Sequence, residues 1–390
     1  MIRVGFVINS LATGGAQMML YKLLSGIDRQ RFAPEVLTLS GTTPVRRSLE
    51  GRFEKIDVPV HVFDMEGGFS KLAAFTKMTG YMRGRFDLVQ TWMYHADLIG
   101  GLAAKLAGGI PVIWNIRHSD LRAGVDKRGT LAVAQMCARL SKILPQAIVC
   151  CAHQALNTHA AMGYDRDRMK VIPNGFDLEK FCRDKKARCA VRQTLGVDAQ
   201  APVIGLVGRY HRQKGHREFL EAAALVSRWY PQSVFVLCGD GVTWENQELI
   251  DLIDTYGLRS RVRLLGRHDD MPGLLPSFDI ATSASICGEG FSNTVGEAMA
   301  CGVPCVVTDV GDSALVVADT GVVVAPQNAV ALAEGWQCLL AMESDMREKW
   351  SQRARARIED HFSLSAIIGQ YQDLFCEVLA QYRPSSHSKG

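Results

Sequence analysis

The sequence is most informative at Gly288-Glu-Gly-Phe-Ser-Asn-Thr-Val-Gly-Glu-Ala-Met-Ala-Cys-Gly-Val-Pro304. The short run Ile280–Ser283 before this stretch is predicted to be a strand. The spacing within the stretch predicts a short helix, Asn293–Ala300, which Gly302 and Pro304 bring to an end. A strand that leads through a glycine-containing loop into a helix is the repeating unit of parallel sheets, so this stretch predicts an α/β fold.

The same alternation of short β-rich runs and helix-length amphipathic segments extends over the rest of the chain. In the first half the predicted strands are Arg3–Asn9, Glu35–Leu39, Val60–Phe63, Leu88–Trp92, Val112–Ile116 and Ala147–Cys151. In the second half they are Val203–Gly208, Val234–Cys238, Val262–Leu265, Ile280–Ser283, Cys305–Thr308 and Gly321–Val324. Two such series predict two Rossmann-like, doubly wound domains that face a central cleft, with ligands bound at the carboxyl ends of the strands.

The boundary between the two domains is predicted at Val171-Ile-Pro-Asn-Gly-Phe-Asp177, where proline and Asn-Gly interrupt regular structure. We therefore expect an N-terminal domain over residues 1–172 and a C-terminal domain over residues 173–363. Residues 364–382 have helical spacing and are expected to pack back on the N-terminal domain.

The predicted helix Asn293–Ala300 offers an anion site at its N-terminus. The backbone N–H groups of residues 291 to 294 have no partner within a helix, and the helix dipole favours negative charge beside them. Glu289 and Glu297 flank this loop and are better suited to hold hydroxyl groups beside a phosphate than the phosphate itself. Glu297 has an alternative explanation, because Thr294-Val-Gly-Glu297 fits a capping box, and Glu289 could be a solvated loop carboxylate.

A second motif, Gly208-Arg-Tyr-His-Arg-Gln-Lys-Gly215, follows the predicted strand of residues 203–208. Arg209 offers a bidentate fork for phosphate oxygens, and Lys214 offers a mobile point charge. The flanking glycines allow a close approach of the backbone to a ligand. A basic surface loop is the alternative, but two cations in the same domain as the anion site favour a clamp for a diphosphate.

The two motifs together resemble the retaining glycosyltransferases of family four, which have the two-Rossmann-domain GT-B fold. The hallmarks of that family are G-R-x-x-x-x-K-G and E-G-F-x-N-x-x-x-E-A-M-A, and this sequence carries them at Gly208–Gly215 and Glu289–Ala300. Gly239-Asp-Gly241 resembles the glycine loop on the nucleotide side, and Gly14-Gly-Ala-Gln17 resembles the glycine loop of the N-terminal domain.

The resemblance implies a role for each matching residue. Arg209 and Lys214 would neutralise the diphosphate, Glu289 would hold hydroxyls of the donor sugar, and Glu297 would hold the ribose. Other residues would contact the donor mainly through their backbone, and these are Gly14, Gly15, Gly208, Gly239, Gly290, Phe291, Ser292, Asn293 and Thr294. The loop at Gly14 would approach the donor phosphate or the acceptor from across the cleft.

The resemblance is weaker in the N-terminal domain, where acceptors bind in this family. Arg117, followed by His118, stands where the family often has a histidine, and His95 lies one turn beyond the end of the fourth strand. An arginine cannot act as a base but can hold a phosphate, for example that of a lipid-phosphate acceptor. His95 and His118 could equally be hydrogen-bonded structural histidines.

The predicted function is transfer of a hexose from a UDP- or GDP-sugar to a hydroxyl of a glycan or lipid-linked acceptor, in polysaccharide or glycolipid synthesis. The resemblance implies retention of configuration through same-face attack, with the nucleotide sugar as co-substrate and no other cofactor. No D-x-D pair follows a strand in a metal-binding arrangement, so we expect no metal. A sugar phosphorylase or a nucleotide-sugar epimerase of the same fold is the alternative among enzymes.

Two further classes of protein share parts of this pattern. A nucleotide-dependent dehydrogenase should carry G-x-G-x-x-G after the first strand, whereas this chain continues Asn9-Ser-Leu-Ala-Thr-Gly-Gly15. A two-domain sugar-binding protein without catalysis would have no need of a cation clamp, and it would normally be exported.

We expect a cytoplasmic protein that does not bind nucleic acid. The 11 cysteines are scattered without a C-x-x-C motif, which is typical of a reducing compartment. No leader and no apolar run of about 18 residues is found. The net charge is +4, and basic side chains interrupt apolar stretches at residues 71–86 and 117–142. Such stretches suit reversible contact with anionic membranes at the inner face, although a solvated helix surface is an equally good explanation.

Overall fold

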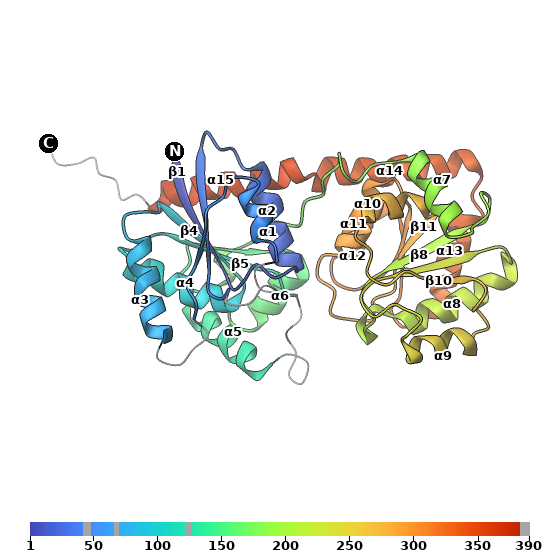
Figure 1. Ribbon diagram of the computed structural model, residues 1–390, viewed down its shortest axis with the longest axis horizontal. Helices are drawn as coiled ribbons and strands as arrows, with labels where there is room; N and C mark the ends of the chain where they lie inside the picture. The colour runs from blue at the N-terminus through green and yellow to red at the C-terminus, as the bar shows by residue number, and fades with distance from the viewer. Residues whose placement is uncertain (42–47, 66–69, 120, 122–126, 383–390) are drawn as a thin grey trace. The chain divides into compact units, whose positions relative to one another are not determined.

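The computed structural model describes residues 1–41, 48–65, 70–119, 121 and 127–382 (Figure 1). These residues form two compact units. Unit 1 comprises Met1–Gly175 together with the chain from Leu364 onward, and unit 2 comprises Phe176–Ser363. The chain thus leaves unit 1 three residues after the boundary expected from the sequence and returns to it at the start of the last helix.

Unit 1 contains a parallel sheet of seven strands in the order β3-β2-β1-β4-β5-β6-β7. The strands are β1 (Ile2–Ile8), β2 (Phe32–Thr38), β3 (Val60–Val62), β4 (Leu88–Trp92), β5 (Val112–Ile116), β6 (Ala147–Cys150) and β7 (Met169–Val171). The helices are α1 (Gly15–Gly26), α2 (Glu50–Glu54), α3 (Ser70–Met82), α4 (Tyr94–Leu106), α5 (Arg128–Leu140), α6 (His153–Ala161) and α15 (Leu364–Tyr382).

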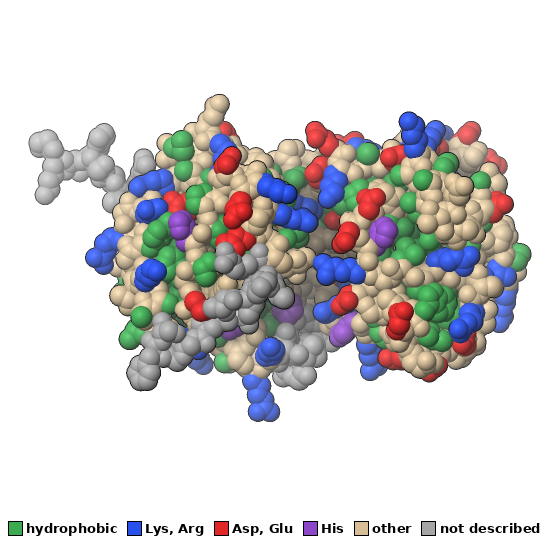
Figure 2. Space-filling model, viewed as in Figure 1, with side chains coloured by type: hydrophobic (Ala, Val, Ile, Leu, Met, Phe, Trp, Pro, Cys, Tyr) green, Lys and Arg blue, Asp and Glu red, His purple; other side chains and the backbone are tan. Residues whose placement is uncertain are grey.

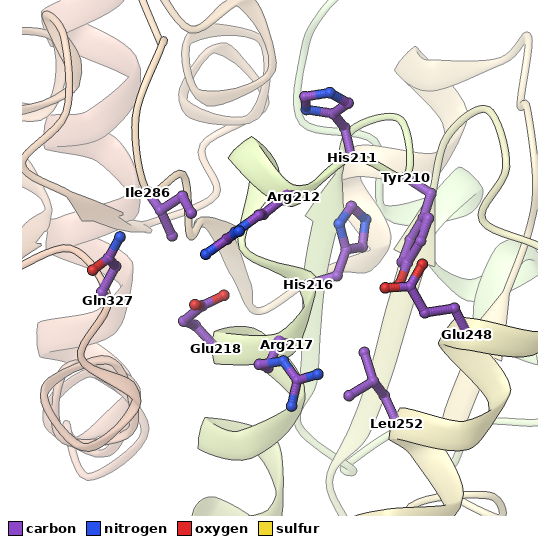
Figure 3. Close-up of a pocket in the computed structure, with 10 residues that line it drawn as sticks. All are labelled: Tyr210, His211, Arg212, His216, Arg217, Glu218, Glu248, Leu252, Ile286 and Gln327. Atoms are coloured by element: carbon purple, nitrogen blue, oxygen red, sulfur yellow. The ribbon is translucent and has the colours of Figure 1, made fainter. Parts of the chain in front are cut away.

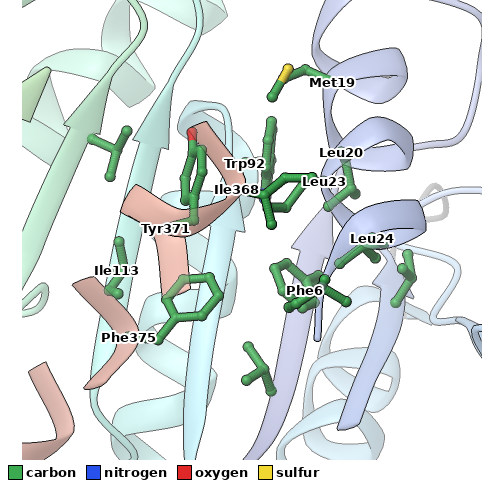
Figure 4. Packing of buried hydrophobic residues seen from close by; sticks show 14 of the residues in the cluster. Phe6, Met19, Leu20, Leu23, Leu24, Trp92, Ile113, Ile368, Tyr371 and Phe375 are labelled. Atoms are coloured by element: carbon green, nitrogen blue, oxygen red, sulfur yellow. The ribbon is translucent and has the colours of Figure 1, made fainter. Parts of the chain in front are cut away.

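Alternation along β1 directs side chains to two helical layers. Phe6 belongs to the core that α1 and α15 cover, where Phe375 of α15 lies edge-on to it with ring centroids 6.1 Å apart (Figure 4). Val7 faces the other layer, where α4 approaches so closely that a Cβ on Gly100 would lie 3.1 Å from the Val7 side chain. The C-terminal helix is therefore an integral part of the core of unit 1.

Unit 2 contains a parallel sheet of six strands in the order β10-β9-β8-β11-β12-β13. The strands are β8 (Val203–Val207), β9 (Val234–Cys238), β10 (Val262–Leu264), β11 (Ile280–Ser283), β12 (Cys305–Thr308) and β13 (Val322–Val324). The helices are α7 (Lys185–Thr194), α8 (His216–Trp229), α9 (Gln247–Thr255), α10 (Met271–Leu274), α11 (Asn293–Ala300), α12 (Ser313–Val317), α13 (Ala329–Leu340) and α14 (Ser344–Phe362).

The strand order of unit 2 reverses between β8 and β11, which are neighbours in the sheet but not in the sequence. Helices after such neighbours leave toward opposite faces, so their loops diverge and open a crevice at the carboxyl ends of the strands. One predicted motif, Gly208–Gly215, follows β8, and the other, Glu289–Ala300, follows β11. The prediction of two Rossmann-like sheets is confirmed.

All twelve predicted strands are present, with ends shifted by up to three residues. The largest shift is in β2, which begins at Phe32 and includes Pro34. Pairing with β3 starts only at Val36, so Pro34 lies where β2 is locally an edge strand and its missing N–H costs no ladder bond. The sequence did not predict β7, a three-residue strand at the edge of the sheet beside β6.

Candidate active site

The anion site predicted at the start of α11 has its helix where the sequence placed it, over Asn293–Ala300. Its N-cap is Ser292, whose side chain makes no capping bond within unit 2, every residue of which the structure describes. Thr294 is the second residue inside the helix, so the capping box suggested for Thr294 and Glu297 is wrong, because its threonine would have to be the N-cap. Because the N-cap side chain does not bond to the first-turn N–H groups, these groups suit an anion.

Phe291, predicted as part of the donor site, contributes only its backbone. Its ring stacks on Phe176 with centroids 5.9 Å apart and packs on Phe362 at 5.5 Å. The side chain is buried in this aromatic cluster of unit 2. The cluster fixes the path of the loop that presents the amide groups at the start of α11.

The two predicted loops are locked together by close backbone contacts. The N–H of Ile286, after β11, donates to the carbonyl of Gln213, after β8, at 2.8 Å. Gly215 has φ +68°, and a Cβ there would lie 1.9 Å from the carbonyl oxygen of Ala284. Only glycine fits at this position, so the second glycine of the motif is needed to bring the two loops together.

Lys214 and Glu289 meet although they are 75 residues apart in the sequence. The Lys214 ammonium donates to Oε2 of Glu289 at 2.7 Å, and the hydroxyl of Ser285 donates to the same oxygen at 2.8 Å. The Glu289 side chain is 12% exposed, so it is not a solvated loop carboxylate. The structure thus brings together a cation and a carboxylate that the sequence assigned to the diphosphate and the sugar.

Arg209 and Gly239 lie beside this pair. Arg209 is exposed, and we find no ion pair for it among the described side chains. Gly239, after β9, approaches the loop so closely that a Cβ would lie 2.1 Å from the carbonyl oxygen of Gly208. The glycine predicted on the nucleotide side therefore allows the loops after β8 and β9 to pack in contact.

Two residues of this site were missed from the sequence, Ser285 and Gly311. Gly311 follows β12 with φ +64°, and a Cβ there would lie 2.3 Å from the carbonyl oxygen of Glu289. The N–H of the next residue, Asp312, donates to the carbonyl of Gly290 at 2.9 Å. The stretch Asp309-Val-Gly-Asp312 could have indicated this part of the site. It contains turn residues and directly follows a strand, at the carboxyl edge of the sheet where ligands bind.

A cavity of about 720 Å³ borders the same loop but is not lined by the predicted catalytic residues (Figure 3). Its walls are Tyr210, His211, Arg212, His216, Arg217, Glu218, Glu248, Leu252, Ile286 and Gln327. Burial, and next the carboxylate of Glu248, raise the pKa of Tyr210 to about 12. Burial lowers the pKa of His216 to about 4, so this imidazole adds no charge at neutral pH. Tyr210, His211 and Arg212 thus face a space that Arg209 and Lys214 do not line.

His95 lies in a smaller cavity of unit 1, of about 210 Å³, at the carboxyl ends of β1, β2 and β4. The cavity walls are Asn9, Ser10, Leu39, Ser40, Met65, His95 and Ile99. Burial lowers the pKa of His95, which favours the neutral imidazole. Gly14, the N-cap of α1, has an extended backbone and contributes no side chain at the start of that helix.

Strained backbone marks the same edge of unit 1. Met93, between β4 and α4, has φ +75° and ψ 155°, a backbone conformation that residues other than glycine rarely adopt. Its N–H donates to the carbonyl of Asn115 at 3.0 Å, and its carbonyl accepts from the N–H of Asp97 at 2.9 Å. These two bonds hold the strained residue directly before α4, the helix that carries His95. Such strain is concentrated at functional sites.

Arg117 is directed into unit 1. Its guanidinium donates to the hydroxyl of Tyr371 in α15 and, at 3.0 Å, to Oδ1 of Asn174. It also lies 4.8 Å from the ring centroid of Trp92. Neither Arg117 nor the half-buried His118 lines the cavity that contains His95. The guanidinium therefore links the end of β5 to the C-terminal helix.

Comparison with known proteins gives the class to which this arrangement belongs. Residues 13–180 match the family described as Glycosyltransferase Family 4, and residues 201–342 match the one described as Glycosyl transferases group 1. The structure is similar to that of Anabaena HepE in complex with UDP, with a TM-score of 0.83 and 23% identity over 96% of this chain and 100% of that one.

Curated relatives agree with the family match. The chain is 28% identical over 236 residues to the UDP-Gal:alpha-D-GlcNAc-diphosphoundecaprenol alpha-1,3-galactosyltransferase of Escherichia coli, over 60% of each protein. It is 28% identical over 355 residues to the D-inositol 3-phosphate glycosyltransferase of Salinispora tropica, over 81% of this chain and 71% of that enzyme. Fold and matches together define a glycosyltransferase of GT-B architecture. The chain belongs to the family 4 type of these enzymes.

Proposed function

We propose that this protein transfers a hexose from a UDP- or GDP-sugar to a hydroxyl of a glycan or lipid-linked acceptor, with retention of configuration, in cell-surface polysaccharide or glycolipid synthesis. The observation that carries the proposal is the meeting of Lys214 and Glu289 at the edge of the sheet where α11 begins. HepE is a structural neighbour solved with UDP and with UDP-glucose, which supports a nucleotide-sugar donor. The Escherichia coli relative is named for a lipid diphosphate acceptor.

The donor diphosphate would be held by charge from two sources. Arg209 and Lys214 supply full positive charges, and the first-turn N–H groups of α11 supply partial ones. Glu289 would accept a hydrogen bond from a hydroxyl of the sugar. Glu297, one turn inside α11, would hold the ribose.

The chemistry needs stabilisation of the leaving group more than a protein nucleophile. The bond from the anomeric carbon to the β-phosphate oxygen breaks, and negative charge builds up on the diphosphate, where the two cations and the helix N-terminus act. The acceptor oxygen bonds to the same face of the anomeric carbon, and its proton passes to the departing phosphate oxygen. Charge on the protein thus takes the part that a divalent metal plays in other transferases.

We place the acceptor hydroxyl at the cavity of unit 1 that contains His95. Its walls combine apolar side chains with Asn9, Ser10, Ser40 and the imidazole, which suits a molecule with both hydroxyl and apolar surfaces. A neutral His95 can accept a hydrogen bond from a second hydroxyl of the acceptor and so position it, while the proton of the attacking hydroxyl remains for the phosphate oxygen. Arg117, whose guanidinium is already bonded to Tyr371 and Asn174, would support this region and would not hold an acceptor phosphate.

A lipid-linked acceptor would bring the enzyme to a membrane, and one surface of unit 1 suits that contact. Helices α3, α4 and α5 pack side by side there, and exposed apolar side chains project from α4, from α5 and from the turn after α5. They are Leu102, Leu106, Met136 and Ile143. Residues 98–119 and 127–164 contain no aspartate or glutamate, whereas Lys105, Arg139 and Lys142 are exposed near these apolar side chains. Figure 2 shows lysine and arginine side chains projecting from the surface of this unit.

A panel of sugar nucleotides tests the proposed function directly. Purified protein would be incubated with UDP-, GDP- and ADP-sugars, and binding and slow hydrolysis would be measured by calorimetry and by release of nucleoside diphosphate. We expect one nucleotide class to bind and to be hydrolysed with release of the α-anomer from an α-linked donor. Release of the β-anomer would contradict retention, and binding of a nicotinamide cofactor without any sugar nucleotide would contradict the proposal as a whole.

A further inference from the structure

We propose that Ser285 is a positioning residue that fixes the rotation of the Glu289 carboxylate and thereby sets how strictly the enzyme selects its donor sugar. The inference rests on the proposed function, because it assigns Glu289 to a hydroxyl of the sugar. Ser285 belongs to neither of the two motifs by which the sequence identifies the site.

The geometry around the carboxylate carries this inference. The ammonium of Lys214 and the hydroxyl of Ser285 both donate to Oε2 of Glu289, at 2.7 and 2.8 Å. Within unit 2, whose residues are all described, we find no donor to the other oxygen, Oε1. Two donors on one oxygen restrict rotation about the last bond of the side chain, so Oε1 is kept as the acceptor for a ligand.

Lysine alone could not impose this orientation. Its ammonium is a point charge with three equivalent donors on a flexible stem, so it attracts the carboxylate without preferring either oxygen. Lys214 is also the cation expected to move toward the diphosphate when the donor binds. Once Lys214 has moved, the hydroxyl of Ser285 still donates to Oε2 of Glu289 and keeps Oε1 available for the sugar.

Ser285 itself is held rigidly. The residue is 1% exposed, and its carbonyl accepts a hydrogen bond from the hydroxyl of Thr308 in β12 at 2.6 Å. Its neighbours on both sides are fixed to the loop after β8, Ala284 by the close approach of Gly215 and Ile286 by its bond to Gln213. Because this backbone is fixed, the hydroxyl of Ser285 can orient the carboxylate. A serine on a mobile surface loop could not do so.

A simpler explanation is that Ser285 uses Glu289 only to satisfy its own buried hydroxyl. The two explanations differ in their effect on sugar selection. If the hydroxyl only needs a partner, its removal changes stability and affects every donor equally. If it orients the carboxylate, its removal affects donors according to the geometry of their hydroxyls.

The test compares Ser285→Ala with Ser285→Cys, which keeps a weak donor of similar shape, and with Ser277→Ala. Ser277 is a buried serine of the same unit whose hydroxyl has no partner among the described residues, and it precedes β11, at the amino end of that strand. Each variant is assayed with the preferred donor, with its hydroxyl epimer and with the free nucleoside diphosphate. Melting temperature is measured in parallel.

We expect Ser285→Ala to lose roughly 10- to 100-fold in kcat for the preferred donor, the range for one hydrogen bond to a charged group. Its preference over the epimer should fall by a similar factor, while affinity for the free nucleoside diphosphate stays within about twofold. Ser285→Cys should lie between Ser285→Ala and the wild type. Ser277→Ala should keep both turnover and preference.

If the wild-type enzyme is active, two results would contradict the role of Ser285 and leave the proposed function intact. One is normal turnover and preference in Ser285→Ala, and the other is an equal loss for all donors together with a fall in melting temperature. A wild-type protein that binds no sugar nucleotide would overturn the proposed function, and this inference with it.

Discussion

At the scale of single residues, the loop Gly208–Gly215 provides a matched pair of arginines. Arg209 directly follows the first glycine, whereas Arg212 faces the large cavity shown in Figure 3. If charge on the diphosphate must be stabilised as the bond breaks, Arg209→Ala and Lys214→Ala should each lower kcat by about 10²–10³-fold, by analogy with loss of one oxyanion donor. Arg212→Ala removes the same charge from the same loop and should lower kcat less than tenfold. Equal losses in the two arginine variants would contradict the assignment of Arg209.

The two glutamates should differ in which kinetic constant they affect. Glu297 lies in the second turn of α11 and would hold the ribose, remote from the reacting carbon, so Glu297→Ala should raise the donor KM more than it lowers kcat. Glu289→Ala should lower kcat and weaken selection between donor sugars. Steady-state kinetics with two donors measures both effects, and near-normal transfer by Glu289→Ala would contradict the whole site assignment.

At the scale of helices and strands, the sequence predicted what depends on local chemistry. Gly302 and Pro304 end α11 where expected, and β8, which precedes the first motif, was predicted because Val203–Val207 is almost wholly apolar. The N-cap is Ser292, as the predicted start of the helix requires, and only the alternative capping box, which needs Thr294 as the N-cap, is wrong.

Contacts between segments that are distant in the sequence could not be predicted. Ser285 and its partner Glu289 are close in sequence, but Lys214, which donates to the same carboxylate oxygen, comes from another loop. Arg117 has the pattern of an exposed strand-end cation, yet Tyr371 arrives with the C-terminal helix and takes its guanidinium inward. Neither partner is visible until the sheet order and the return of α15 are known.

The first turn of α4 contains a buried acid that should make stability depend on pH. Asp97 is fully buried and accepts from the hydroxyl of Thr91 at 2.5 Å, and burial raises its pKa to about 7. The folded protein therefore keeps a proton that the unfolded chain loses near pH 4. The stability from this group is fully present below pH 4 and is lost as pH rises to about 7.

Asp97→Asn removes this titration, since an amide stays neutral. We expect the wild type to lose a few kcal/mol, to order of magnitude, relative to the variant between pH 4 and pH 8. Burial lowers the pKa of His159 to about 4, which opposes this trend below pH 6.5, but it acts on both proteins and cancels in the difference. Urea unfolding over this pH range measures it, and parallel stability curves for the two proteins would show that Asp97 does not hold its proton.

At the scale of the whole molecule, the charge for catalysis should come from the protein. In the parts of the chain that the structure describes, no three His, Cys, Asp or Glu side chains cluster as a metal site requires. We expect turnover to be unchanged within about twofold by excess chelator, because Arg209, Lys214 and the start of α11 supply the positive charge. Activity that disappears with chelator and returns with magnesium or manganese would show that these groups do not suffice.

The surface of unit 1 that we propose for contact with a lipid bilayer can be tested directly. Over the described residues no helix is long and apolar enough to span a membrane. The sequence predicted reversible contact through residues 71–86 and 117–142, of which residues 120 and 122–126 lie outside the described residues. Leu106 and Ile143, 60% and 63% exposed, lie close in sequence to Lys105 and Lys142, so apolar insertion and attraction to anionic headgroups act together.

Flotation with vesicles that contain phosphatidylglycerol should recover the wild-type protein at low salt and much less of it at high salt, because screening weakens the attraction of the lysines. The double variant Leu106→Ser, Ile143→Ser should float several-fold less at low salt while keeping its melting temperature, since both side chains are largely exposed. Leu315→Ser in unit 2 is the control, because Leu315 is also exposed, at 42%, but lies on the other unit. No flotation of the wild type even at low salt, or an equal loss in the control, would contradict this surface. Binding to uncharged phosphatidylcholine vesicles at the same level would show that the basic side chains are not needed.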